Sequence, residues 1–308
     1  MAEPLSSTQG KRDHISVCIC TYRRPKLLAH LLHCLKDQKT EDLFAFSVVV
    51  VDNDAEQTAR AIAEEFKTDI GISLEYCVEQ EKGYSPARNK AVRHAKGNLL
   101  AFIDDDEYPG DSWLLNLYKA SKVYEASGVL GPVNPYFDSE PPSWIIKGKL
   151  CERESFPTGT VLQNPKYTRT GNVLLEMALF QEANPFDPRY GQTGGEDTDF
   201  FLRMMKEGKR FVWCDEAPVW ELVPPERLQR VYFIKRALLR GFIHSRHMSL
   251  IQPQTLKSLS AFFFYTVALP FCLVMGQHVF MKCLIRNCDH IGKLLGLAGM
   301  APVKHRTF

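Results

Sequence analysis

The stretch NLLAFIDDDE, residues 98–107, runs from an apolar strand pattern directly into four consecutive acids. The apolar pattern ends at Ile103, and no residue in 104–107 supplies a counter-charge. Four adjacent carboxylates repel one another, so that either a cation or water must compensate them. Carboxylate oxygens suit Mg2+ or Mn2+, and ligands of open α/β sheets bind at the carboxyl ends of parallel strands. The stretch therefore predicts either a metal that carries a diphosphate or a solvated acidic turn.

Outward from this stretch, short apolar runs alternate with helical patterns from residue 14 to about residue 111. Such alternation predicts βαβ units, and thus an α/β fold with a mainly parallel sheet covered on both faces. The predicted strands are 15–22, 46–54, 72–79 and 98–107, and the predicted helices are 25–38, 58–67 and 85–97.

A second acidic group, DND at 52–54, follows another purely apolar strand. The carboxyl ends of parallel strands meet at one edge of a sheet, so two acidic strand ends favour a site there. Asp52 is suited to accept hydrogen bonds from a ribose or a base. An Asx turn at the strand end explains the same residues.

A third group lies in GQTGGEDTDFFLRMMKEG, residues 191–208. Glu196, Asp197 and Asp199 fall at the predicted start of a helix, where acids cap the helix and interact favourably with its dipole. Capping does not require all three acids or the two glycines before them. A carboxylate held at a rigid helix start is also suited to act as a general base.

The composition limits the class of protein. The 308 residues include 38 Lys and Arg against 36 Asp and Glu, a net charge of +2, which excludes a nucleic-acid-binding surface spread over the whole chain. Hydrophobic residues make up 45% and charged residues 24%, which excludes disorder and fibrous structure. The nine cysteines show no CxxC spacing and favour reduced thiols in a cytosolic protein over disulfides or a metal site. The polar N-terminus does not resemble a signal peptide.

The last part of the chain predicts contact with a membrane. Residues 226–257 are a basic helical stretch, and 258–281 carry no charge over a length that, as a helix, would cross a hydrocarbon core. A buried helix of a soluble protein is the alternative. Because basic residues flank the uncharged stretch on both sides, a re-entrant or interfacial hairpin broken at Pro270 fits better than a simple span.

Together these motifs resemble the family 2 glycosyltransferases with the GT-A fold, over about residues 14–245. Within the family, the chain is most similar to bacterial exopolysaccharide enzymes of the succinoglycan glucosyltransferase kind. The motifs, in the family's order, are SVCICTYRRPKLL, VVVVDND, EQEKGYSPARNKAVRHAKG, LLAFIDDDEYP, TGNVLLE, FDPRYGQTGGEDTDFFLR and VPPERL.

The resemblance implies a binding site for a nucleotide-sugar donor. Thr21, Tyr22 and Arg23, at the end of the first strand, are expected on the nucleotide. Asp52 is expected on the uracil or ribose, and Arg88 at the base or the diphosphate.

It also implies roles for the acidic motifs. Asp104 matches the first acid of the family's DxD motif and would face the ribose, with Asp105 beside it in the donor site. Asp106 matches the third position, which coordinates Mn2+ or Mg2+ on the diphosphate. Asp197 would deprotonate the acceptor hydroxyl, and Glu196 would position the acceptor.

Two departures from the family pattern matter. Glu221 stands where many GT-A enzymes place a histidine ligand, so it is the expected further metal ligand. The QxxRW signature of processive polymerases is replaced by LQRVY, which predicts one sugar per visit.

The resemblance thus implies an inverting, metal-dependent transfer from a nucleotide-sugar, a UDP-hexose, to a polyprenyl-diphosphate-linked saccharide at the cytoplasmic face of the inner membrane. A polyprenyl-phosphate glycosyltransferase and a non-catalytic sugar-nucleotide-binding scaffold remain as alternatives. A dehydrogenase is disfavoured because no glycine follows the first strand. The expected organisation is a loose tail (1–13), a donor-binding half (14–111), an acceptor-binding half (112–225), a basic amphipathic helix (226–257) and a membrane-associated segment (258–308).

Overall fold

A computed structural model describes residues 12–69, 72–191, 194–246, 248–249 and 252–300. The chain divides into two compact units, each with a hydrophobic cluster of its own. The first comprises Met1–Val133, Glu154–Gly191 and Glu196–Trp220, and the second comprises Asn134–Arg153, Gln192–Gly195 and Glu221–Phe308. Most of the predicted tail, residues 1–11, lies outside the described residues.

The first unit is built on a seven-stranded sheet of order β3-β2-β1-β4-β8-β6-β9. Strands β1 to β4 are parallel, whereas β8 runs antiparallel to both of its neighbours. The predicted α/β fold with a mainly parallel sheet is confirmed. The strands are β1 (Asp13–Thr21), β2 (Phe44–Asp52), β3 (Leu74–Val78), β4 (Leu99–Phe102), β6 (Gly128–Leu130), β8 (Val173–Glu176) and β9 (Phe211–Trp213).

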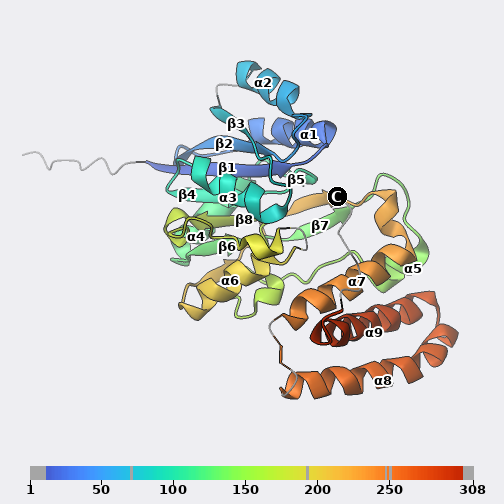
Figure 1. The fold of residues 1–308 in the computed structure, drawn as a ribbon. Helices are drawn as coiled ribbons and strands as arrows, with labels where there is room; N and C mark the ends of the chain where they lie inside the picture. The colour runs from blue at the N-terminus through green and yellow to red at the C-terminus, as the bar shows by residue number, and fades with distance from the viewer. Residues whose placement is uncertain (1–11, 70–71, 192–193, 247, 250–251, 301–308) are drawn as a thin grey trace, which may run out of the picture. The chain divides into compact units, whose positions relative to one another are not determined.

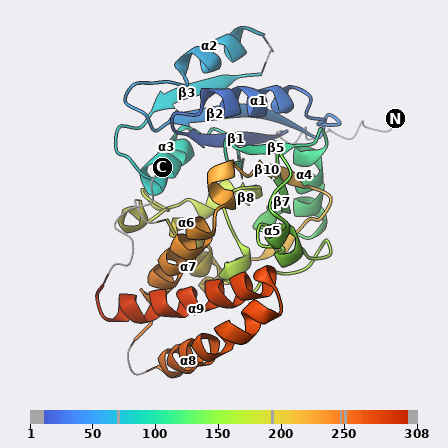
Figure 2. The same ribbon diagram turned by 90° about the vertical axis from the view of Figure 1, so that its right-hand side faces the viewer.

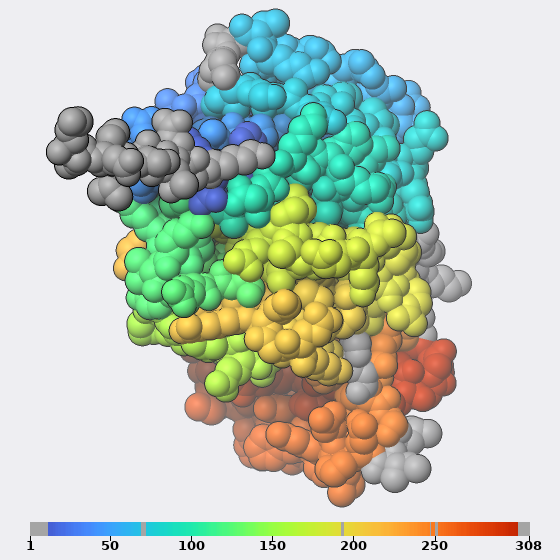
Figure 3. Space-filling view, turned by 90° about the vertical axis from the view of Figure 1, so that its left-hand side faces the viewer, coloured from blue at the N-terminus to red at the C-terminus, as the bar shows by residue number. Residues whose placement is uncertain are grey.

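Helices cover both faces of this sheet (Figure 1). Side chains of β1 alternate between the faces, so that Val17 joins one buried cluster and Cys18 the other. The space-filling view shows α3, in teal, and α6, in gold, at the surface on one side of the unit (Figure 3). Helices α1 (Pro25–Lys36), α2 (Arg60–Asp69) and α4 (Trp113–Val123) join the first cluster, and α3 (Tyr84–His94) and α6 (Glu196–Lys206) join the second. Short 3-10 turns are η1 (Pro165–Tyr167), η2 (Met177–Leu179) and η3 (Pro188–Tyr190).

The predicted strand 98–107 is shorter in the structure, because β4 ends at Phe102. The acids that follow form a tight turn, in which the backbone N–H of Glu107 donates to the carbonyl of Asp104 at 3.1 Å. The chain then enters β5 (Glu107–Pro109), part of a three-stranded sheet of order β5-β10-β7. In β7 (Val133–Tyr136) and β10 (Val219–Leu222) the chain passes from one unit to the other.

The second unit is helical, and α9 lies between α7 and α8 (Figures 1 and 2). The predicted basic helix 226–257 is divided, since α7 ends at Ser245 and a separate helix begins at Pro253. The predicted break at Pro270 is wrong, because α8 continues through it. The turn lies instead at Gly276, whose φ of 122° favours glycine. The helices are α5 (Ser143–Gly148), η4 (Pro225–Leu228), α7 (Arg230–Ser245), α8 (Pro253–Val274) and α9 (Gln277–Leu297).

Two glycines allow α7 and α9 to touch through their backbones. A Cβ atom on Gly241 would lie 2.0 Å from the carbonyl oxygen of Asp289, and one on Gly292 would lie 2.1 Å from that of Leu238. No side chain fits at such distances without a shift of the backbone. The packing of these two helices therefore depends on the absence of a side chain at both positions.

We expect Gly292→Ala to destabilise the protein by about 1–3 kcal/mol, because the strain of overpacking exceeds the gain of about 1 kcal/mol in helix propensity. The measurement is the thermal unfolding midpoint followed by circular dichroism. Gly110→Ala is the matched control, since its new Cβ would meet no atom within 4 Å. A midpoint for Gly292→Ala at or above that of the parent would contradict the close approach.

Candidate active site

The acidic strand ends lie at one edge of the seven-stranded sheet. In the parallel register, Thr21 at the end of β1 lies opposite Asp52 at the end of β2, and β4 is the other neighbour of β1. In the sheet, β2 lies on one side of β1 and β4 lies on the other. The connections that leave β1 and β3 therefore run in opposite directions, and the carboxyl end of β1 is a topological switch point. The structure therefore gathers the segments after β1, β2 and β4 where α/β folds bind ligands.

Asp105 is anchored inside this edge. The side chain is buried, and its carboxylate accepts hydrogen bonds from the Thr21 hydroxyl at 2.7 Å and from Arg24 at 3.1 Å. Burial raises the pKa of Asp105, although the positive charge of Arg24 acts against this rise. Asp105 thus ties the ends of β1 and β4 together.

Arg24 also reaches the next acid, and the sequence analysis did not identify it. Its guanidinium lies 3.2 Å from the carboxylate of Asp106. The sequence contains a signal for this contact. Arg24 lies between β1, the strand that neighbours β4, and Pro25, where α1 begins. The parallel pairing of β1 with β4 brings the segment that carries Arg24 to the same edge of the sheet as the end of β4.

Glu107 shapes the acidic turn from within. It is 1% exposed, and its carboxylate accepts a hydrogen bond from the backbone N–H of Asp104 at 3.1 Å. The side chain of Asp104, in contrast, is 47% exposed. Of the four consecutive acids, Asp105, Asp106 and Glu107 are therefore buried, and Asp104 reaches solvent.

Arg88 of α3 connects this turn to the helix start at 196–197. Its guanidinium forms an ion pair with the buried carboxylate of Glu196 and lies 3.6 Å from the carboxylate of Asp104. Arg88 is 8% exposed and Glu196 is 3% exposed. Arg88 thus contacts two other predicted site residues, Asp104 and Glu196, which are far apart in the sequence.

The same helix fixes the chain segment that leads toward α6. Asn89 exchanges two hydrogen bonds with the backbone of Phe186, at 2.7 and 2.9 Å. The Ser85 hydroxyl donates to the carbonyl of Asp187 at 2.8 Å, and the backbone N–H of Tyr84 donates to the carbonyl of Gly191. Helix α3 therefore positions this segment as well as the acids on either side of Arg88.

Asp197 is the partly exposed neighbour of Glu196. Its carboxylate accepts a hydrogen bond from the backbone N–H of Thr198 at 2.7 Å, at the first turn of α6. The two adjacent acids differ in environment, since Glu196 is buried against a guanidinium and Asp197 reaches the surface. Of the two acids, only the Asp197 side chain is therefore accessible at the surface.

Tyr22 follows β1, and two cations lie near its ring. The guanidinium of Arg23 lies 5.3 Å from the centre of its ring, and the ammonium of Lys82 lies 5.7 Å from it. Arg23 is itself held by the buried Asp54 at 3.2 Å. An aromatic face with flanking positive charge suits a nucleobase and its phosphates.

Asp52 is placed differently from an exposed ligand. It is fully buried, and its carboxylate accepts hydrogen bonds from the backbone N–H groups of Asp54 and Ala59 and from the Tyr76 hydroxyl. Burial and this carboxylate raise the pKa of Tyr76. In the structure, Asp52 holds the turn between β2 and α2 together.

Glu221, the expected further metal ligand, belongs to the second unit. Its carboxylate is paired with Arg153 and lies 2.8 Å from Arg227. Burial raises the pKa of Glu221, but the charges of Arg153, Arg227 and Arg236 outweigh it and hold the pKa below its usual range. The Glu221 carboxylate therefore already compensates two guanidinium groups, Arg153 and Arg227.

A metal site is not evident from protein ligands alone. Among the residues that the structure describes, no three His, Cys, Asp or Glu side chains are grouped so as to hold an ion. Mg2+ is commonly bound by one or two carboxylates together with substrate phosphates. The carboxylates at the end of β4 have the oxygen chemistry that such an arrangement needs.

We expect Arg88→Met to destabilise the protein by about 3–5 kcal/mol, because it leaves the Glu196 carboxylate buried without its cation. The double variant Arg88→Met/Glu196→Gln should recover a large part of this loss. Urea unfolding of the four species in a double-mutant cycle measures the coupling. Additive effects of the two substitutions would show that the pair is not coupled.

The arginine pairs of Glu221 should make stability depend on pH. Because the pKa of Glu221 is lower in the folded state, its contribution is complete above its unfolded pKa of about 4.3 and is lost as the pH falls through the folded pKa. Glu221→Gln should therefore reduce the stability difference between pH 7 and pH 3 in urea unfolding. Glu207→Gln, at an exposed position, is the control. An equal pH dependence for both variants would contradict the assignment.

Comparisons with known proteins identify the family of the chain. The family model described as "Glycosyl transferase family 2" matches residues 16–183. The chain is 34% identical over 237 residues to the succinoglycan biosynthesis protein ExoM of Rhizobium meliloti (strain 1021), covering 76% of this chain and 74% of that protein. It is 27% identical over 246 residues to a chondroitin synthase of Escherichia coli, covering 69% of this chain but only 35% of that longer protein.

The fold is likewise similar to a solved structure. S. aureus TarS 1–349 in complex with UDP-GlcNAc superposes with a TM-score of 0.52 at 17% identity, covering 93% of this chain and 92% of the other. With an α/β unit of this topology, acidic motifs gathered at its switch point and a family model that matches more than half of its length, the chain belongs to the family 2 glycosyltransferases and has their GT-A type of fold.

Proposed function

We propose that this glycosyltransferase moves one sugar per binding event from a nucleotide-sugar, a UDP-hexose, to a lipid-linked saccharide during cell-surface polysaccharide synthesis. The single observation that carries the proposal is that Arg88 holds both the acidic turn after β4 and the start of α6. A donor at the first and a base at the second would then lie close together. ExoM, named for succinoglycan biosynthesis, supports the polysaccharide product.

The donor would bind along the carboxyl edge of β1, β2 and β4. The Tyr22 ring offers a face for the base, and Arg23 and Lys82 beside it offer positive charge for the phosphates. Thr21 and Arg24 hold Asp105 in place, so that the neighbouring Asp104 can face the ribose. The TarS complex with UDP-GlcNAc, on a similar fold, supports a nucleotide-sugar as donor.

Asp106 is the proposed protein ligand for Mn2+ or Mg2+. Its side chain is 10% exposed, and its carboxylate oxygens are the donors that these ions prefer. When bound there with the diphosphate, such an ion supplies positive charge to the departing nucleoside diphosphate. Arg24, within 3.2 Å of Asp106, compensates the same carboxylate in the protein itself.

Asp197 is the proposed general base. The acceptor hydroxyl oxygen forms a bond to C1 of the sugar from the face opposite the nucleotide, and its proton passes to the Asp197 carboxylate. The bond between C1 and the diphosphate oxygen breaks, and its electron pair leaves with the nucleoside diphosphate. Only one protein carboxylate must accept a proton, and the configuration at C1 is inverted. Glu196, buried against Arg88, keeps the helix start that carries Asp197 in position.

The acceptor is proposed to be lipid-linked because the chain carries a surface suited to a membrane. Helix α8 is long and apolar enough, by length and composition, to cross a bilayer. A nucleotide-sugar donor is a cytoplasmic metabolite, which supports a reaction at the cytoplasmic leaflet. The absence of the QxxRW signature supports transfer of one sugar rather than polymerisation.

Two variants should separate donor binding from transfer. We expect Asp106→Ala to lose the Mn2+-dependent thermal shift with UDP-sugars, because its carboxylate anchors the ion on the diphosphate. Asp197→Asn should keep that shift but lose kcat by about 10²–10⁴-fold, the range for a proton-transfer residue. Transfer is measured with radiolabelled UDP-sugars and a lipid extract, and Asp138→Asn, at an exposed position, is the control.

Several outcomes would contradict the proposal. Transfer by Asp197→Asn at the parent rate would exclude it as the base. A thermal shift with GDP- or dTDP-sugars but not with UDP-sugars would overturn the donor, and sugar transfer to polyprenyl phosphate itself would overturn the acceptor. Binding of donors without any turnover in the presence of lipid extract would favour a scaffold.

A further inference from the structure

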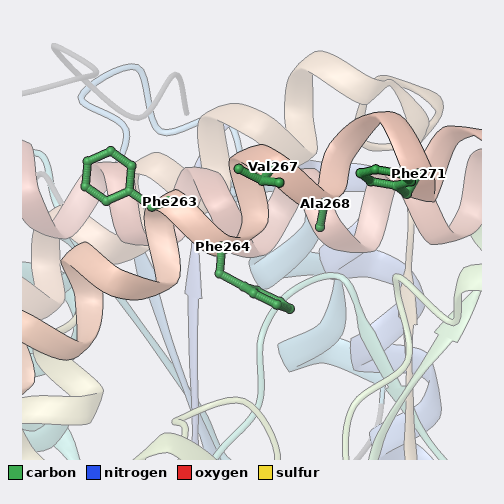
Figure 4. A pocket seen from close by; sticks show the side chains of 5 residues that line it. All are labelled: Phe263, Phe264, Val267, Ala268 and Phe271. Carbon is green, nitrogen blue, oxygen red and sulfur yellow. The ribbon is translucent and has the colours of Figure 1, made fainter.

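Helix α8 presents a long apolar face to solvent. Of its 22 residues only Ser258 is buried. Exposed apolar side chains recur every three or four residues, and Figure 4 shows Phe263, Phe264, Val267 and Phe271 projecting from the helix. The exposed fractions are 66% for Leu256, 59% for Phe263, 67% for Phe264, 68% for Val267, 69% for Phe271 and 91% for Val274. An apolar surface of this extent on a folded protein marks an interaction site.

The other side of α8 is fastened to α9. The Cys283 thiol donates to the carbonyl of Tyr265 at 3.6 Å, and the Asn287 amide donates to the Thr266 hydroxyl at 3.1 Å. The Tyr265 ring stacks on His290 with centroids 6.0 Å apart. Helix α8 therefore lies alongside α9 and has two distinct faces, one packed and one apolar and exposed.

Helix α9 could not accompany α8 across a bilayer. It carries the exposed cations Lys282 and Arg286, and it is joined to α7 by the ion pair between Arg240 and Asp289 at 2.7 Å. Ionic side chains are costly within the hydrocarbon core. A crossing α8 would either pull these charges into the core or abandon its contacts with α9. An orientation parallel to the membrane surface requires neither.

The charge on these helices favours one kind of partner. Together α7, α8 and α9 carry eight Lys and Arg against the single acid Asp289, although the whole chain has a net charge of only +2. Two copies of this chain joined through α8 would bring the net positive charge of α8 and α9 in each copy closer together, without an acid on α8 to compensate it. A bilayer with anionic headgroups satisfies the apolar face and the cations at once.

We infer that α8 lies in the plane of the membrane interface, with Phe263, Val267 and Phe271 among the acyl chains and nearby cations on anionic headgroups. The inference deepens the membrane attachment in the proposed function, on which it rests, by specifying its geometry and its lipid class. It implies that the enzyme is a monotopic protein on one leaflet.

The test is flotation of the full-length protein with sealed vesicles of phosphatidylcholine, with or without phosphatidylglycerol. We expect binding that needs phosphatidylglycerol, weakens at high salt, and falls at least about tenfold in Val267→Glu/Phe271→Glu, because acidic side chains replace inserted apolar ones. Val123→Glu is the matched control, since Val123 is 72% exposed on α4 of the first unit. Circular dichroism verifies that both variants are folded.

Two further readouts decide between geometries and partners. A peptide tag after Phe308 should be digested by protease added outside the vesicles, whereas protection of the tag would show a crossing and overturn the inference. Sedimentation without lipid should show the same oligomeric state for the parent protein and for the double variant. Dimer loss with unchanged flotation would assign the apolar face to self-association.

Flotation is measured without turnover, so this inference and the proposed function fail separately. A chain that floats but transfers no sugar would overturn the function alone. A chain that transfers sugar and does not float would overturn only the attachment.

Discussion

The ion pair between Arg88 and Glu196 is the interaction on which the arrangement of the site depends. Both groups are buried, so removing either leaves a charge that the protein interior compensates poorly. Because Arg88 also lies 3.6 Å from Asp104, one side chain on α3 sets the position of two acidic motifs. These motifs are separated by about ninety residues of sequence, and only the fold brings them to a common cation.

Within each motif, burial divides chemically identical acids into two kinds. Asp105, Glu107 and Glu196 are at most 4% exposed and hold the backbone or a guanidinium in place. Asp104 and Asp197 are more exposed, and Asp106, the proposed metal ligand, is buried beside Arg24. The buried Asp105, Glu107 and Glu196 thereby fix the backbone that carries the more exposed acids.

Sequence reasoning succeeded where a local pattern had one structural solution. The alternation of apolar strands and helices fixed the α/β class, and the order of motifs identified the family. The end of β4 was placed too late because Ile103 continues the apolar pattern, whereas the turn depends on hydrogen bonds of Glu107 that no pattern shows. Arg24 was missed because its partners Asp105 and Asp106 are distant in sequence. Asp52 lies buried in a turn because it accepts hydrogen bonds from the backbone of Asp54 and Ala59 and from Tyr76, which the apolar strand pattern does not reveal.

The net charge of +2 conceals a separation of charge between the units. Eight of the 38 Lys and Arg lie on α7, α8 and α9 with one of the 36 acids, so the remainder of the chain is net acidic. The acidic remainder includes the strand-end carboxylates, which suit a cation and its diphosphate, and the basic helices suit an anionic surface. The same chain therefore presents opposite charges to its two proposed partners. The positive charge of the helices and the negative charge of the remainder nearly cancel in the net charge of the chain. The composition alone therefore does not reveal that the two charges are separated.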